Sequence, residues 1–269
     1  MTAEEKIQRI KDFRPIDDVF FEIMADDTEV CQEILRVIMD DNKLIVDEVI
    51  VQSSKKNIYG RSVRLDALCY LSSGKRVNIE VQRSDNDNHL KRARFNSASI
   101  TVKESTAGKK FAEIVDVYIV YISEFDIFHG NSPIYHIDKV IRETGERIDD
   151  GSSEIFVNTA INDGSDLAEL MACFTQKYVQ NPKFPKLSSR VKMLKTTEGG
   201  ASAVCEIMEK YQAEAVKEAE KEASIRTTIQ FGHKYNISKA NLIEELISNY
   251  GLSESEAHSK YAEYAPILK

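Results

Sequence analysis

Two acidic residues, Asp66 and Glu80, stand at matching distances from a short polar turn, and this spacing predicts that their carboxylates meet. Segments 61–71 and 75–82 are alternating runs rich in β-branched residues, separated by residues 72–74, as in a β-hairpin. If residues 72–74 form the loop, Asp66 lies directly opposite Glu80. Opposed residues have Cβ atoms about 5 Å apart, so two like charges repel by roughly 3 kcal/mol at an effective dielectric constant near 20. The hairpin therefore requires something that offsets this repulsion.

Three arrangements would offset the repulsion, and the spacing alone leaves all three open. The carboxylate face can be wet and screened by solvent, or it can be neutralised by Arg64 or Arg76 on the same face. The third arrangement is a bound divalent cation, because Mg²⁺ takes carboxylate oxygens and keeps several of its waters. A loop one residue longer would shift the register and separate the two carboxylates.

The hydrophobic pattern predicts the elements that must position these carboxylates. Apolar residues recur at three- and four-residue intervals over 15–39 with a break at 25–28, which predicts two helices. Segment 44–52 is another alternating strand, so the hairpin belongs to a three-stranded meander. A helix is predicted over 89–105, and the continuously apolar segment 114–122 predicts a central strand covered on both faces. The expected order is helix, three strands, helix, strand.

The second half of the chain has a weaker pattern. The two prolines within 181–190 predict a linker, and the chain from residue 201 onward is expected to be nearly all helix. We expect one domain over residues 1–190 and a helical accessory region over 191–269. The remaining expected elements are strands at 134–141 and 154–161 and helices at 163–178, 237–250 and 252–264.

Composition limits the class of protein. The 269 residues are 42% hydrophobic, enough for a substantial core, and no apolar run approaches the roughly 20 residues that span a bilayer. The charged start of the chain does not read as a signal peptide, so we expect a cytoplasmic protein with no membrane contact. The four cysteines are far apart in the sequence and are expected to be reduced and buried. A net charge of −8 argues against nonspecific coating of nucleic acid as the main role.

Five short motifs then occur in an order that resembles a known nuclease superfamily. They are PIDDVFFEIM at 15–24, RLDALCYL at 64–71, VNIEVQ at 77–82, KRARFN at 91–96 and VDVYIVYISEFDIF at 115–128. Their order resembles the PD-(D/E)xK nucleases, and more specifically the bacterial PD-(D/E)xK family transposases, the recombination-promoting nuclease group. The likeness covers about residues 12–128 and extends more loosely to about residue 200.

The resemblance implies roles for individual residues. It makes Asp66 and Glu80 ligands of Mg²⁺, with Mn²⁺ as the alternative ion, and it makes Asp17 a third ligand, although the adjacent Asp18 leaves that alignment ambiguous. Gln82 occupies the position of the superfamily's lysine and points to the same face as Glu80. Glutamine carries no charge, but it can orient an attacking water while the metal neutralises the developing charge.

A basic segment follows the strand that carries Glu80. Between Arg83 and Lys110 seven Lys or Arg residues stand against three acids, a local charge of +4. Phosphate contacts supply most nonspecific DNA affinity, so Lys91, Arg92 and Arg94 are the expected DNA-binding residues. The alternative is an ordinary solvated amphipathic helix with one arginine paired to a core acid. His89 reads as a surface histidine.

Together these inferences predict a fold and a function. The expected fold is α/β, a restriction-endonuclease-like core of order α-β-β-β-α-β with a mixed central sheet flanked by helices and an α-helical C-terminal extension. The resemblance implies a metal-dependent DNA endonuclease that hydrolyses phosphodiester bonds in transposition or recombination, and a homodimer where both strands are cut. Two other classes stay open: a catalytically silent DNA-binding or regulatory module on the same scaffold, and a protein-interaction scaffold built on the C-terminal helices.

Overall fold

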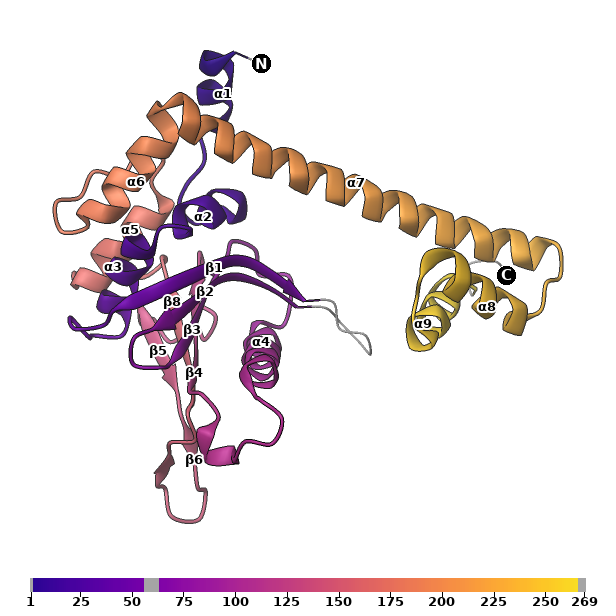
Figure 1. The fold of residues 1–269 in the computed structure, drawn as a ribbon, viewed down its shortest axis with the longest axis horizontal. Coiled ribbons are helices and arrows are strands. Elements are labelled where there is room, and N and C mark those ends of the chain that lie inside the picture. The colour runs from indigo at the N-terminus through magenta and orange to yellow at the C-terminus, as the bar shows by residue number, and fades with distance from the viewer. Residues whose placement is uncertain (1, 56–62, 266–269) are drawn as a thin grey trace. The chain divides into compact units, whose positions relative to one another are not determined.

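A computed structural model describes residues 2–55 and 63–265 of the chain (Figure 1). The described residues divide into two compact units, the first ending at Cys205 and the second beginning at Glu206. Each unit has its own buried core. Within the described residues no helix is both long and apolar enough to cross a membrane.

The first unit is built around a mixed six-stranded sheet with strand order β1-β2-β3-β4-β8-β5 (Figure 1). Strands β1, β2 and β3 form an antiparallel meander, β3, β4 and β8 are parallel, and β5 returns antiparallel to β8. A short hairpin, β6 and β7, extends from it. The strands are β1 (Val46–Lys55), β2 (Val63–Leu71), β3 (Arg76–Gln82), β4 (Val117–Ser123), β5 (Ile134–Ile137), β6 (Lys139–Val140), β7 (Arg147–Ile148) and β8 (Ser152–Asn158).

Helices cover both faces of this sheet. The predicted helix pair is confirmed as α2 (Asp18–Ala25) and α3 (Thr28–Ile38), and α3 begins where Asp27 accepts a hydrogen bond from the Glu29 N–H. The basic helix is confirmed as α4 (His89–Glu104), which packs on the face of β2 and β4 opposite to α2 and α3. The predicted order helix, three strands, helix, strand is therefore confirmed.

The predicted hairpin register is confirmed. Leu71 donates its N–H to the carbonyl of Lys75 at 3.0 Å, and Gly74 turns the chain with a φ of +88°, a conformation that favours glycine. Further along, Ala67 pairs with Ile79, which is the register that sets Asp66 beside Glu80. The predicted start of this strand at Arg61 lies outside the described residues.

Strand β4 is the predicted central strand, flanked by β3 and β8 and covered by helices on both sides. Its side chains alternate between the two faces, and nearly all of them are buried. The face under α4 includes Tyr121, which is fully buried beside Phe156 and Leu68. Because it is buried, β4 is a rigid support beside the end of β3 that carries Glu80.

The predicted linker at 181–190 is wrong, because helix α6 (Pro185–Thr196) begins inside it. Pro185 occupies the first turn of α6, where a missing N–H costs nothing and the fixed φ favours the helix. The open N–H groups of Lys186 and Leu187 donate to the carboxylate of Glu33 in α3. Helix α6 therefore packs onto α3 of the first unit, and the expected boundary at residue 190 falls within it.

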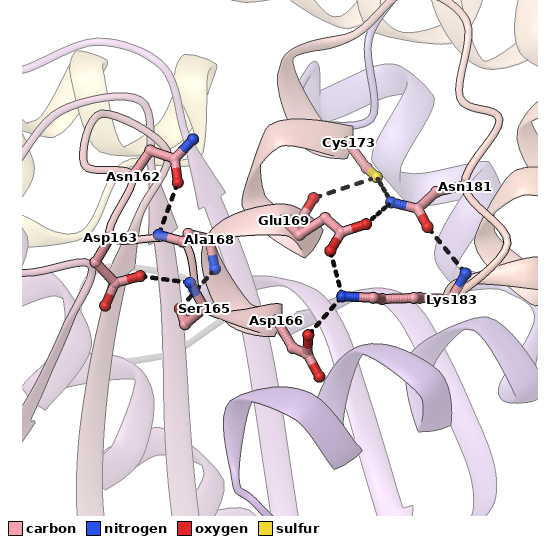
Figure 2. A network of polar contacts seen from close by, with 10 residues as sticks. Asn162, Asp163, Ser165, Asp166, Ala168, Glu169, Cys173, Asn181 and Lys183 are labelled. Atoms are coloured by element: carbon pink, nitrogen blue, oxygen red, sulfur yellow. Dashed lines mark hydrogen bonds and ion pairs between the residues drawn. The ribbon is translucent and has the colours of Figure 1, made fainter.

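A polar network ties the preceding loop to helix α5 (Asp166–Thr175), as Figure 2 shows. The ammonium of Lys183 donates to Asp166 at 2.8 Å and to Glu169 at 2.6 Å, and Asn181 donates to the second oxygen of Glu169 at 2.9 Å. Helix α5 itself is capped by Ser165, which accepts from the N–H of Ala168. These hydrogen bonds hold the C-terminal end of the loop between α5 and α6 against α5.

The remaining helices are α1 (Ala3–Ile10) in the first unit, α7 (Glu198–Lys234), and α8 (Lys239–Tyr250) and α9 (Glu254–Tyr264) in the second. The second unit buries Ile225, Ile229 and Leu246 between the C-terminal part of α7 and the other two helices. Gly251 ends α8 with a φ of +62°, between the two expected helices. All four cysteines are buried and free of disulfides, as predicted.

Candidate metal and phosphodiester site

Strands β2 and β3 separate where the two carboxylates lie. The backbone pairing of β2 with β3 ends at Ala67 and Ile79, and beyond it the side chain of Asp66 replaces the backbone as the hydrogen-bonding partner. The N–H of Val81 donates to Asp66 Oδ2 at 3.0 Å, and the N–H of Asp66 approaches Glu80 Oε1 at 3.4 Å. The carboxylates of Asp66 and Glu80 are therefore neighbours, as the spacing predicted.

Burial makes this pair electrostatically costly. The side chain of Glu80 is only 1% exposed, because α4 covers it, so the wet, solvent-screened face considered from the sequence is not formed at Glu80. Burial, followed by the charge of Glu80 and that of Asp18, raises the pKa of Asp66 well above its usual value. Burial also raises the pKa of Glu80, although the Asn78 amide, which donates to Glu80 Oε1 at 2.6 Å, opposes the shift. Additional positive charge would relieve both groups.

The nearest cation is Arg92, on the first turns of α4. Its guanidinium lies 3.5 Å from Glu80 Oε2 and donates to Gln82 Oε1 at 3.1 Å. The pKa of Arg92 is raised despite its burial, because Glu80, Tyr121 and Asp66 favour the charged form. Arg76, one of the two cations that the sequence offered for this role, pairs instead with Glu104 at 2.9 Å.

Gln82 lies at the position expected from the resemblance, on the same strand as Glu80. Its amide oxygen accepts from Arg92, and its amide nitrogen donates to the carbonyl of Ser84 at 2.9 Å. The side chain is therefore held in one orientation between two partners. The same amide nitrogen also donates to the Ser84 hydroxyl at 3.3 Å.

Asp17 and Asp18 differ sharply in their surroundings. Asp17 is 7% exposed, accepts from the Arg14 N–H at 2.6 Å and forms an ion pair with Arg83 at 2.7 Å. Both residues line a pocket of about 460 Å³ together with Gln82, and Asp18 is the exposed one of the two. Its charge contributes to the raised pKa values of Asp66 and Glu80, after burial. The structure thus brings Asp18 toward the carboxylate pair and engages Asp17 with two arginines.

His89 is buried, contrary to its reading as a surface histidine. Its Nδ1 lies 2.9 Å from the Tyr121 hydroxyl and its Nε2 lies 3.0 Å from Asp85 Oδ1, and the side chain is 5% exposed. His89 and Arg92 are one turn apart on α4, so this contact fixes the turn that presents the guanidinium. The spacing of Asp85 and His89, four residues apart, was the one signal in the sequence for this contact.

The other expected DNA-binding residues point outward. Lys91 and Arg94 are exposed on α4. Arg92 is 36% exposed and reaches the carboxylates instead. The three residues therefore separate into one cation at the site and two on the adjoining surface.

The donor set matches a hard divalent ion better than a transition metal. Within residues 2–55 and 63–265 no three His, Cys, Asp or Glu side chains converge as a closed cluster for a metal. Mg²⁺ does not require such a cage, since it binds through one or two carboxylates and fills its sphere with waters and substrate phosphates. Two adjoining carboxylates with raised pKa values, one buried and one half-buried, fit that ion.

A mixed sheet flanked by helices, with an acidic pair where the second and third strands separate, defines a restriction-endonuclease-like α/β protein. A family model described as PD-(D/E)XK nuclease family transposase matches residues 17–162, more than half of the chain, and the chain belongs to this family. No curated protein and no solved structure gave a match. The family places the chain among nucleases that act in transposition, and PD-(D/E)XK nucleases generally use divalent metal ions.

Proposed function

We propose that this protein is a Mg²⁺-dependent DNA endonuclease that hydrolyses phosphodiester bonds during transposition or recombination in the bacterial cytoplasm. The observation that carries the proposal is the adjacent pair of the half-buried Asp66 and the buried Glu80, with Arg92 3.5 Å from the second carboxylate. A purely structural site gains nothing from two adjacent acids, because burial and repulsion destabilise their charged forms.

In this proposal Asp66 and Glu80 hold the ion, and Asp18 or Asp17 completes the acidic set. When bound, the metal supplies a Lewis acid that polarises the phosphate and lowers the pKa of water. Mn²⁺ is the expected substitute, since carboxylate and water ligands suit both ions. The same pocket that Asp18 and Gln82 line, about 460 Å³ in volume, leaves room for a phosphodiester.

Two side chains together take the role that the lysine has in the superfamily. Gln82 orients the attacking water through its amide, and Arg92 supplies the positive charge that glutamine lacks. A fixed guanidinium stabilises negative charge that develops on the phosphoryl oxygens, and it needs no reorganisation at the moment of reaction. The hydrogen bond between the two side chains fixes their orientation relative to each other.

Lys91 and Arg94 are proposed to hold the DNA backbone next to this site. Both are exposed and lie within one turn of Arg92, so a duplex that reaches the metal passes over them. Contacts of this kind position the substrate without reading its sequence. A homodimer would bring a second site to the opposite strand.

The proposal is tested by incubating supercoiled and linear DNA with wild type and with Glu80→Ala, in Mg²⁺, Mn²⁺ or EDTA, at low and moderate salt. Cleavage that requires the ion and is lost in Glu80→Ala supports the nuclease and the carboxylate pair together. DNA binding without cleavage by either protein would reject the nuclease and identify a silent DNA-binding module.

A further inference from the structure

Helix α6 carries a buried lysine that reaches toward the site from outside the matched family region. Lys195 is 3% exposed, and its ammonium donates to three backbone carbonyls. The acceptors are Lys11, at 3.0 Å, Phe13 and Lys177. Three N–H donors meet three carbonyls from two separate stretches of chain, so the ammonium is fully used.

The same ammonium also lies against an aromatic ring on α2. It is 5.3 Å from the ring centre of Phe20 and 5.2 Å from that of Tyr178. The ring of Phe20 is stacked on that of Phe13 at 6.4 Å. Lys195 therefore contacts the chain at residue 13 and again at residue 20, on either side of Asp17 and Asp18.

Other contacts hold the same stretch of chain in place. The N–H of Ile16 donates to the carbonyl of Phe174 at 3.1 Å, which ties the stretch to α5. The loop that supplies the Lys177 carbonyl is fastened to α5 by the network of Figure 2. Lys195 thus joins two supported segments.

An apolar residue in this place would remove the donor that the three carbonyls share. Burying an ammonium is unfavourable unless every donor is satisfied. Burial lowers the pKa of Lys195 to about 8, with Lys177 adding to the shift and Asp17 and Asp12 opposing it. The side chain is therefore an ammonium at neutral pH, and its three donors stabilise one arrangement of an irregular segment.

We infer that Lys195 is a positioning residue for the metal site: it fixes residues 13–20 and thereby sets where Asp17 and Asp18 stand relative to Asp66 and Glu80. The inference rests on the proposed function and extends it to helix α6, which lies outside the family region at residues 17–162. Residues that orient metal ligands from behind commonly change metal affinity by about 10–100-fold.

The structural part of the inference is tested without any activity measurement. Hydrogen exchange is followed by mass spectrometry in wild type, Lys195→Met, Lys195→Gln and the control Lys192→Met, whose lysine is exposed on the same helix. We expect faster exchange in peptides covering residues 11–21 in Lys195→Met, a smaller increase in Lys195→Gln, and none in the control. Unchanged exchange in both Lys195 variants would overturn the inference, and Lys195→Gln serves if Lys195→Met does not fold.

The positioning role is tested by the metal dependence of cleavage. In the Lys195 variants the Mg²⁺ concentration for half-maximal cleavage should rise about 10–100-fold, whereas the KM for DNA stays within about twofold. Faster exchange together with an unchanged Mg²⁺ midpoint would overturn the positioning role and leave only a structural one. If wild type cleaves no DNA, the proposed function fails, and the midpoint is read from Mg²⁺-dependent thermal stabilisation instead; no stabilisation of wild type would overturn the inference as well.

Discussion

The guanidinium of Arg92 lies 3.5 Å from Glu80 Oε2 and 3.1 Å from Gln82 Oε1, so one side chain from α4 joins both residues of the Glu-x-Gln motif. A lysine in place of Gln82 would bring its own charge to this point. Here the charge arrives from a neighbouring helix, and Gln82 provides a hydrogen-bonding partner that orients it. In the proposed nuclease, this geometry lets a neutral residue occupy the lysine position.

Arg92→Ala should therefore lower kcat more than it weakens DNA binding. Removing one preorganised group that stabilises developing charge costs about 10²–10³-fold in kcat. Single-turnover cleavage at saturating DNA and Mg²⁺ measures this loss, and Gln82→Lys in the same background should recover part of it by returning a cation to the site.

Lys91→Ala is the matched control for Arg92→Ala, because Lys91 is the adjacent residue and is exposed. It should leave kcat unchanged, weaken DNA binding and reduce the slope of log K against log salt by about 0.9 for duplex DNA. Equal effects of the two variants on DNA affinity, with no loss of kcat in Arg92→Ala, would show that Arg92 is only another phosphate contact.

Glu80→Gln should separate metal binding from folding. The substitution keeps the size of the fully buried Glu80 side chain and removes its negative charge. Burial disfavours that charge, as the raised pKa of Glu80 shows, so the metal-free variant should be at least as stable as wild type. Mg²⁺ at ten times its Kd should stabilise wild type by about 1.4 kcal/mol and leave the variant unchanged. Thermal unfolding with Mg²⁺ and with EDTA measures both effects, and equal stabilisation of the two proteins would place the ion elsewhere.

Much of the core could be predicted because it depends on local rules. The register of the hairpin follows from the three-residue turn and the twofold alternation of strands, and it set Asp66 beside Glu80 correctly. The predicted linker at 181–190 was wrong because proline ends a helix in most positions but favours its first turn, where Pro185 lies. The contact between Arg92 and Glu80 depends on how α4 packs on the sheet, and no local pattern encodes that.

The choice between Asp17 and Asp18 shows the same limit. Adjacent residues at the start of a helix point in different directions, so the motif alone could not decide which carboxylate faces the site. Asp17 pairs with Arg14, three residues before it, and with Arg83. The second pairing depends on where the segment after Gln82 lies relative to α2, and no local pattern encodes that.

Asp18→Asn and Asp17→Asn should consequently have different effects. Asp18→Asn should raise the Mg²⁺ concentration for half-maximal cleavage with little change in stability, because Asp18 is exposed on the pocket. Asp17→Asn removes one of the two acids that Arg14 and Arg83 share, the other being Glu124, so it should lower the free energy of unfolding by about 1–3 kcal/mol. Urea unfolding and metal titrations of the two variants measure this contrast, and a reversed pattern would make Asp17 the ligand.

The lowered pKa of Lys195 predicts how stability depends on pH. An unfolded lysine titrates near pH 10.4, whereas burial brings the pKa of Lys195 to about 8 in the folded protein. Between these values the unfolded chain binds the proton that the folded protein has lost, so the free energy of unfolding of wild type rises with pH. The penalty for burying the ammonium is fully present below pH 8 and disappears as pH rises. Relative to Lys195→Met, wild type should gain about 2 kcal/mol between pH 7 and pH 9.5.

Urea unfolding of wild type and Lys195→Met over this pH range isolates the contribution of Lys195, because every other titrating group is common to both proteins. Asp17, Asp12 and Lys177 face the ammonium, so their charges enter the measured difference. A difference that stays constant from pH 7 to pH 9.5 would mean that the three carbonyls stabilise the ammonium enough to cancel the effect of burial. Lys195 would then hold residues 13–20 equally well over that whole range.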